Sequence, residues 1–202
     1  MSYNEFIASG GNKKEAKNYG NVVNPPLLTS TCGEMKILNI CNPPELHLMT
    51  VTVGKLIKEI IRKIFPTCEE GKEFVDQWLK KEDIRRCVYQ GSASFEGNQC
   101  KKILLRADLS MVTAYREQGD EIYRKAEPLL NTLLEFQKVV KCCFGQELLY
   151  NAEGNPMHPE LILSFMKSYR SLDITVPLKV HIIEGHISDF LASKDNKHGL
   201  GK

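Results

Sequence analysis

The sequence predicts a mainly α-helical protein built around one globular unit. The chain has 202 residues, 42% of them hydrophobic, which is enough apolar surface to bury a core. In several long stretches the apolar residues recur every three or four positions, the period of one helix face. Strand-like alternation of polar and apolar residues is confined to a short stretch, residues 35–40.

The predicted domain organisation has three parts. Residues 1–34 are rich in Gly, Asn, Lys and Ser, which indicates an extended or poorly ordered lead-in. Residues 35–192 form the helical domain, and the Asn-Pro-Pro sequence at 42–44 ends its opening strand. Residues 193–202 form a flexible C-terminal end.

An amphipathic helix is predicted after this Asn-Pro-Pro sequence. Pro66 ends it, and a second helix over Cys68–Lys81 has acids in its first turn and lysines in its last, as the helix dipole favours. The apolar face of the first helix comprises Leu46, Met49, Val53, Leu56, Ile57, Ile60, Ile61 and Ile64. Its opposite, charged face comprises Lys55, Lys58, Glu59, Arg62 and Lys63.

A loop and a short helix are predicted next. Residues 91–94, Gly-Ser-Ala-Ser, indicate the loop, and Asn98 is expected to cap the helix through its side-chain oxygen. The helix carries three consecutive apolar residues at 103–105. We expect Phe95, Ile103 and Leu104 to face the core.

The longest apolar face in the sequence follows, over residues 122–144, and ends at Gly145. Pro128 falls within it. Because proline suits a first helical turn and disrupts a helix interior, this helix either begins anew near Glu127 or bends there.

Two further helices are predicted towards the C-terminal end. The second of them has an apolar stripe flanked by His181 and His186. Two histidines five residues apart lie about 140° out of phase on an ideal helix, so we interpret them as packing residues rather than metal ligands. The first helix carries Leu161, Ile162, Phe165, Met166 and Tyr169, and the stripe of the second comprises Val180, Ile183, Ile187 and Leu191.

Charge and cysteine content limit the classes of function. The formal net charge is +2, so no overall field attracts nucleic acid or an acidic membrane. The seven cysteines are odd in number and contain no C-x-x-C pair, and the start of the chain has no apolar signal segment. No run approaches the roughly 18 apolar residues of a membrane span. These observations predict an intracellular protein, cytoplasmic or nuclear, with reduced thiols and no structural zinc.

No self-sufficient catalytic motif is present, and the glycine pairs lack the spacing of phosphate-binding loops. The best-placed candidates for catalysis are Glu45 and His47, directly after the predicted strand. The alternative interpretation of Glu45 is a first-turn acid that stabilises a helix N-terminus. No metal ligands, cofactor or small-molecule ligand are expected from the residues themselves.

Basic residues on two predicted helices are candidates for nucleic-acid binding. If they share a face, they would contact phosphates without reading the base sequence. The alternative is a solvated charged surface, because acidic residues are interspersed among them. The candidates are Lys55, Lys58, Arg62, Lys63, Lys101, Lys102 and Arg106.

Four stretches carry a family resemblance that covers most of the chain. They are P-P-E-L-H-L-M at 43–49, F-E-G-N-Q-C-K-K-I-L at 95–104, F-Q-K-V-V-K-C-C-F-G at 136–145 and P-L-K-V-H-I-I-E-G-H-I-S-D-F at 177–190. In this order they resemble a family of DNA-transposon-derived proteins of invertebrates. These are similar to cut-and-paste transposases, whose RNase H-like cores contain a helical insertion between metal-binding carboxylates.

The resemblance implies that residues 37–40 form a core strand, that Glu45 or His47 lies near the second carboxylate position, and that the later helices are mostly insertion. A divalent metal is implied only if a parent protein is an active transposase. A first Asp and a DNA-binding module would then lie upstream, and a last carboxylate would follow Lys202, so the flanking segments of the parent are expected partners.

The sequence therefore supports three hypotheses about function. The first is a fragment of a transposase-like protein that is not catalytic alone. The second is a helical interaction module recruited from a mobile element, and the third is a metal-dependent nuclease. The expected partners are DNA, through a local basic face, or the missing parent segments, and no membrane.

Overall fold

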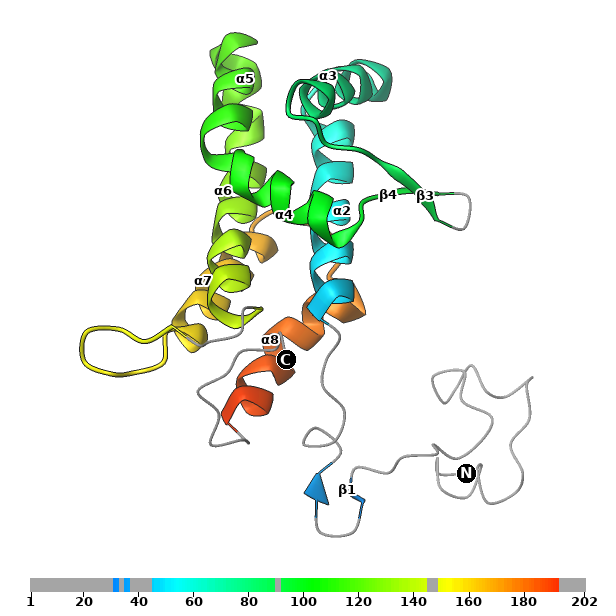
Figure 1. The fold of residues 1–202 in the computed structure, drawn as a ribbon. Coiled ribbons are helices and arrows are strands. Elements are labelled where there is room, and N and C mark those ends of the chain that lie inside the picture. The colour runs from blue at the N-terminus through cyan, green and yellow to red at the C-terminus, as the bar shows by residue number, and fades with distance from the viewer. Residues whose placement is uncertain (1–30, 33–34, 37–44, 90–91, 145–148, 193–202) are drawn as a thin grey trace, which may run out of the picture. The chain divides into compact units, whose positions relative to one another are not determined.

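The computed structural model describes residues 31–32, 35–36, 45–89, 92–144 and 149–192 (Figure 1). Its contacts divide the chain into two units, Met1–Cys41 and Asn42–Lys202. In the first unit, strand β1 (Thr31–Cys32) pairs antiparallel with β2 (Met35–Lys36). The strand predicted over 35–40 is thus described at its first two residues only. Most of the predicted lead-in and the predicted C-terminal end lie outside the described residues.

The described part of the second unit is mainly helical, as predicted. Its strands are β3 (Cys87–Tyr89) and β4 (Ser92–Ser94), which form an antiparallel hairpin. Its helices are α2 (Glu45–Lys63), α3 (Cys68–Lys81), α4 (Gly97–Arg106), the π-helical turn η3 (Ala107–Met111), α5 (Val112–Glu117), α6 (Asp120–Cys143), α7 (His158–Arg170) and α8 (Leu178–Ala192).

Helix α2 is enclosed by four other helices, because α3, α4, α6 and α8 all pack against it. Most of its predicted apolar face is buried, whereas Leu46 at the start is exposed. Burial also extends beyond that face to Leu48 and Thr52, and the Thr52 hydroxyl donates a hydrogen bond to the Leu48 carbonyl at 2.7 Å. The helix is therefore enclosed over a wider arc than one apolar face requires.

The turn from α2 to α3 contains Pro66, as predicted, and depends on two further residues, Thr67 and Gly71. The Thr67 side chain caps α3 by accepting a hydrogen bond from the Glu70 backbone N–H at 3.2 Å. A Cβ atom at Gly71 would overlap the carbonyl oxygen of Ile61. Glycine at this position therefore lets the first turn of α3 lie directly against the backbone of α2.

The prediction that Asn98 caps the short helix is wrong. Helix α4 begins at Gly97, so Asn98 lies inside its first turn, and Glu96 at the cap position makes no side-chain capping bond. The space that a Cβ atom at Gly97 would need is taken by the side chain of Leu46 from α2. Tertiary packing on α2 thus positions the start of α4 without a side-chain cap.

The structure differs from one further expectation and excludes one of the two alternatives at Pro128. Part of the predicted loop at 91–94 belongs to β4, because backbone hydrogen bonds to β3 define this strand despite the weak strand preference of Ser-Ala-Ser. Helix α6 runs without interruption through Pro128, so it does not begin anew near Glu127. The Pro128 carbonyl also accepts a hydrogen bond from the Thr132 hydroxyl at 2.8 Å.

The C-terminal part of the core is formed where α6, α7 and α8 meet. The ring of Phe136 on α6 lies 5.0 Å, centroid to centroid, from that of Phe165 on α7, and Tyr169 lies one turn further at 5.7 Å from Phe165. The predicted stripe of α8 is fully buried, which confirms its role in packing. Phe95, Ile103 and Leu104 are buried as expected.

His158, the first residue of α7, is a buried titratable group. Its side chain is 5% exposed, its Nδ1 atom has no hydrogen-bond partner among the described residues, and burial lowers its pKa below the usual value. A positive charge would also be unfavourable at a helix N-terminus. His158 is therefore held neutral in the folded chain.

Replacing Ile187 with alanine tests the packing role of α8. The side chain is fully buried, so the substitution should lower the free energy of unfolding by about 2–5 kcal/mol, whereas His181→Gln at an exposed position should cost less. Urea unfolding of both variants measures the difference. The reverse ranking would contradict a core role for this stripe.

Acidification tests the neutral state of His158. The unfolded chain takes up a proton near the ordinary pKa of about 6.5, and the folded chain does so only at lower pH. This contribution should therefore lower stability as pH falls from about 7 towards 5. The loss of stability between pH 7 and 5, measured by urea midpoints, should be smaller in His158→Gln than in the unsubstituted chain. In His181→Gln it should equal that of the unsubstituted chain. An unchanged pH profile in His158→Gln would disprove this assignment.

Candidate functional site

An open, largely apolar groove lies between α4 and α6. Leu104 at its base is buried, and Leu105 beside it is 60% exposed. The Gln137 side-chain amide of α6 donates a hydrogen bond to the Leu104 carbonyl at 2.6 Å and joins the two helices. We call this feature the α4–α6 groove; its lining residues are Lys101, Leu104, Leu105, Gln137, Val140, Lys141 and Phe144.

The π-helical turn η3 continues the chain from α4 and adds a second exposed leucine. Ala107 and Met111 of this turn are buried, and Leu109 between them is 77% exposed. A π-helical turn changes the angular spacing of side chains relative to an α-helix. Two exposed leucines, Leu105 and Leu109, thus follow one another within a single helical turn.

Two lysines line the groove, Lys101 from α4 and Lys141 from α6, and we call them the rim lysines. Neither forms an ion pair with any described residue. Nearby Lys138, in contrast, pairs with Glu135 at 2.6 Å. The groove therefore combines apolar lining residues with two lysines that form no ion pair among the described residues, and Lys101 also lines a second depression with Glu45 and Glu96.

The predicted catalytic candidates are not brought together. Glu45, half-buried in the first turn of α2, lines a separate depression with Glu96 and Lys101. His47 is exposed and is not part of its lining. The position of Glu45 agrees with the alternative interpretation, in which its carboxylate stabilises the N-terminus of α2.

Most of the basic residues of α2 that were predicted to bind nucleic acid form ion pairs with Glu59. It was expected on the exposed face, but it is only 3% exposed. Its carboxylate lies 2.9 Å from Lys55 Nζ, 3.8 Å from Arg62 and 3.9 Å from Lys63. Because α2 is enclosed on several sides, the three cations compensate a buried anion rather than forming a free basic face. Lys58 is exposed and has no ion pair among the described residues.

The candidates on α4 are engaged in a similar way. Lys102 Nζ lies 3.4 Å from the Asp83 carboxylate, and Arg106 Nε lies 3.4 Å from that of Glu82. Glu82 also accepts a hydrogen bond from Ser110, whose hydroxyl in turn accepts one from the Trp78 indole at 3.0 Å. Lys102 and Arg106 thus tie α4 to the end of α3, and Lys101 alone of the three lies at the groove.

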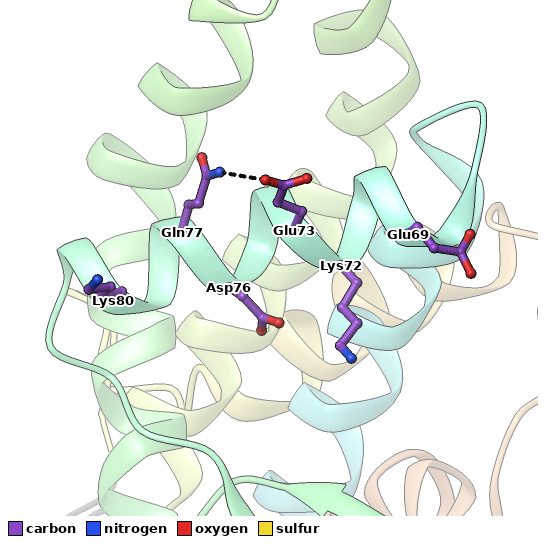
Figure 2. Close-up of a pocket in the computed structure, with 6 residues that line it drawn as sticks. All are labelled: Glu69, Lys72, Glu73, Asp76, Gln77 and Lys80. Atoms are coloured by element: carbon purple, nitrogen blue, oxygen red, sulfur yellow. Dashed lines mark hydrogen bonds between the residues drawn. The ribbon is translucent and has the colours of Figure 1, made fainter.

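The exposed face of α3 has a shallow depression that differs in character from the groove. All six of its lining residues come from this one helix, and they carry charges of both signs (Figure 2). Gln77 donates a hydrogen bond to Glu73 at 3.2 Å (Figure 2). Asp76 also forms an ion pair with Arg86, which lies outside the depression, at 2.7 Å. A helix surface that presents charges of both signs is typical of a solvated face.

The described residues form no metal site. In the described part of the chain, no group of three or more His, Cys, Asp and Glu side chains could hold a metal ion. A hydrogen bond from the Cys143 thiol lowers the pKa of Cys142 to about 7, yet both side chains are fully buried.

The rings of His181 and His186 on α8 lie 5.9 Å apart, closer than their angular separation on an ideal helix suggested. No helix among the described residues is long and apolar enough to cross a membrane.

Sequence reasoning missed the groove, although one signal pointed to it. Residues 103–105 are three consecutive apolar residues, and a helix cannot direct all three towards one core. Leu105 is the one left outside. Val140 and Phe144 were expected in the core, and nothing in the sequence indicated that they also border an open surface with Lys141.

Comparisons with models of protein families, with curated proteins and with solved structures found no match for this chain.

Substituting Glu59 by glutamine tests its role in neutralising three cations. The change preserves size and removes the buried charge that these cations surround, so the free energy of unfolding should fall by about 1–3 kcal/mol. Glu121→Gln is the matched control, because it removes an exposed carboxylate that pairs with Lys125 at 2.7 Å. Chemical denaturation at neutral pH should show a much smaller effect for the control. Equal effects would indicate that Glu59 is no more important than a surface acid.

Proposed function

We propose that this chain is a helical protein-interaction module and that the α4–α6 groove receives apolar side chains of its partner. The observation that carries this proposal is the open apolar groove itself, bordered by Leu105, which is 60% exposed directly beside the buried Ile103 and Leu104 of α4. Exposed apolar surface next to polar or charged residues is typical of binding sites in soluble domains.

The alternatives have less support from the described residues. A nucleic-acid-binding face would need free cations, but most of the candidate basic side chains pair with Glu59, Asp83 or Glu82. A nuclease would need converging carboxylates, and no described group of metal ligands supports one. Magnesium- or manganese-dependent plasmid nicking that is lost in Glu45→Gln would support the nuclease instead.

We also propose that the module descends from a DNA transposon and is a fragment of a transposase-like protein. Four stretches of the sequence support this proposal, among them residues 95–104 and 177–190. The genomic sequence directly after Lys202 tests it. An in-frame continuation with a Ser-Glu-Gln-like stretch would support a longer parent, and a stop codon there would argue against one.

The groove can be tested with an uncharged fluorescent dye. N-phenyl-1-naphthylamine gains fluorescence in apolar surroundings, so the purified chain should bind it with a stoichiometry of about one. Leu105→Glu should reduce binding by about tenfold or more, because a carboxylate is strongly unfavourable at an apolar contact. The fluorescence titration should be accompanied by unfolding curves, since an exposed residue can be changed with little loss of stability.

Leu163→Glu is the matched control. Leu163 is 71% exposed on α7 and does not line the groove. Dye binding should survive in this variant. Equal loss in both variants, or no loss in Leu105→Glu, would show that the groove is not the main exposed apolar site.

A further inference from the structure

The shape of the α4–α6 groove favours a short helix as its occupant. The lining residues on α6 run from Gln137 to Phe144, about 10 Å along the helix axis. This length corresponds to about two turns of a helix laid alongside, enough for two apolar side chains spaced three or four residues apart. The groove lies between two helices, which is the setting in which amphipathic helices commonly dock.

The rim lysines indicate which charge this occupant should carry. Lys101 comes from α4 and Lys141 from α6, and no described acidic side chain forms an ion pair with either. A helix in the groove would present the residues beside its apolar anchors to these two ammonium groups. Opposite charges at such positions favour docking, and like charges disfavour it.

We infer that the α4–α6 groove binds an acidic amphipathic helix of a partner protein, with two apolar anchors on its floor and carboxylates at Lys101 and Lys141. This inference rests on the proposed function of the groove and adds the chemistry of the partner.

The composition of the terminal segments does not match this occupant. Residues 1–30 contain three lysines and two glutamates, and residues 193–202 contain three lysines and one aspartate. Neither segment has an excess of acid to pair with the rim lysines. The charge complementarity therefore points to a segment of another protein.

The test is a titration of the full chain, isotopically labelled for NMR, with three designed helical peptides of about 14 residues each. All three have leucines at positions i and i+4, and the flanking residues are all glutamate, all glutamine or all lysine. NMR suits a small contact area, for which binding is expected to be weak. The glutamate peptide should bind most tightly, and its shift changes should centre on α4 and α6.

Variants of the chain separate the charge effect from the docking itself. Lys101→Gln and Lys141→Gln should each weaken binding of the glutamate peptide by about two- to fivefold, and leave the glutamine peptide nearly unaffected. The dependence of binding on salt should fall in the same variants. Lys58→Gln removes an exposed lysine of α2 outside the groove and should change neither.

Each alternative outcome is decisive. Equal binding of the three peptides at α4 and α6 would overturn the acidic partner and leave the groove as a docking site. Failure of all three peptides would overturn the helical occupant, and if the dye titration also failed, the proposed function would fall with it. Self-association of the chain that is lost in Leu105→Glu, seen by sedimentation, would identify a second copy as the occupant instead.

Discussion

The enclosure of α2 is the constraint on which the rest of the second unit depends. Four other helices pack against it, so its surface must be compatible with burial over far more than one amphipathic face. The Thr52 hydroxyl meets this requirement by bonding to the carbonyl of Leu48 within the helix. Glu59 meets it by drawing three cations around its carboxylate, since a buried charge needs partners.

The same constraint explains why the basic residues of α2 are poor candidates for binding a partner. Lys55, Arg62 and Lys63 are held near Glu59 by the charge that the core encloses, and Lys63 also donates a hydrogen bond to the Leu172 carbonyl at 3.2 Å. Releasing them to contact phosphate would leave the Glu59 carboxylate buried without compensation. The ion pairs with Glu59 and any contact with an external phosphate would therefore use the same side chains.

The α4–α6 groove arises because α4 packs against both α2 and α6 and still has an apolar residue outside these contacts. Helix α4 contacts both α2 and α6, near which it runs in Figure 1. Its residues Cys100, Ile103 and Leu104 are buried. Leu105 then falls outside the core, and the π-helical turn that follows buries Met111 while leaving Leu109 exposed. The rim lysines differ from Lys102 and Arg106 in their surroundings, because Lys102 and Arg106 form ion pairs with Asp83 and Glu82 at the end of α3.

The sequence by itself determined the helical class, the break at Pro66, the end of the long apolar face by Gly145 and the buried stripe of α8, because these follow from local periodicity and from the conformational preferences of proline and glycine. The tertiary structure alone decided the burial of Glu59, the start of α4 at Gly97 and the passage of α6 through Pro128. It also decided which lysines lack an acidic partner. These features depend on which helices meet in space, and a one-dimensional pattern records spacing along the chain but not the neighbours that folding brings to each face.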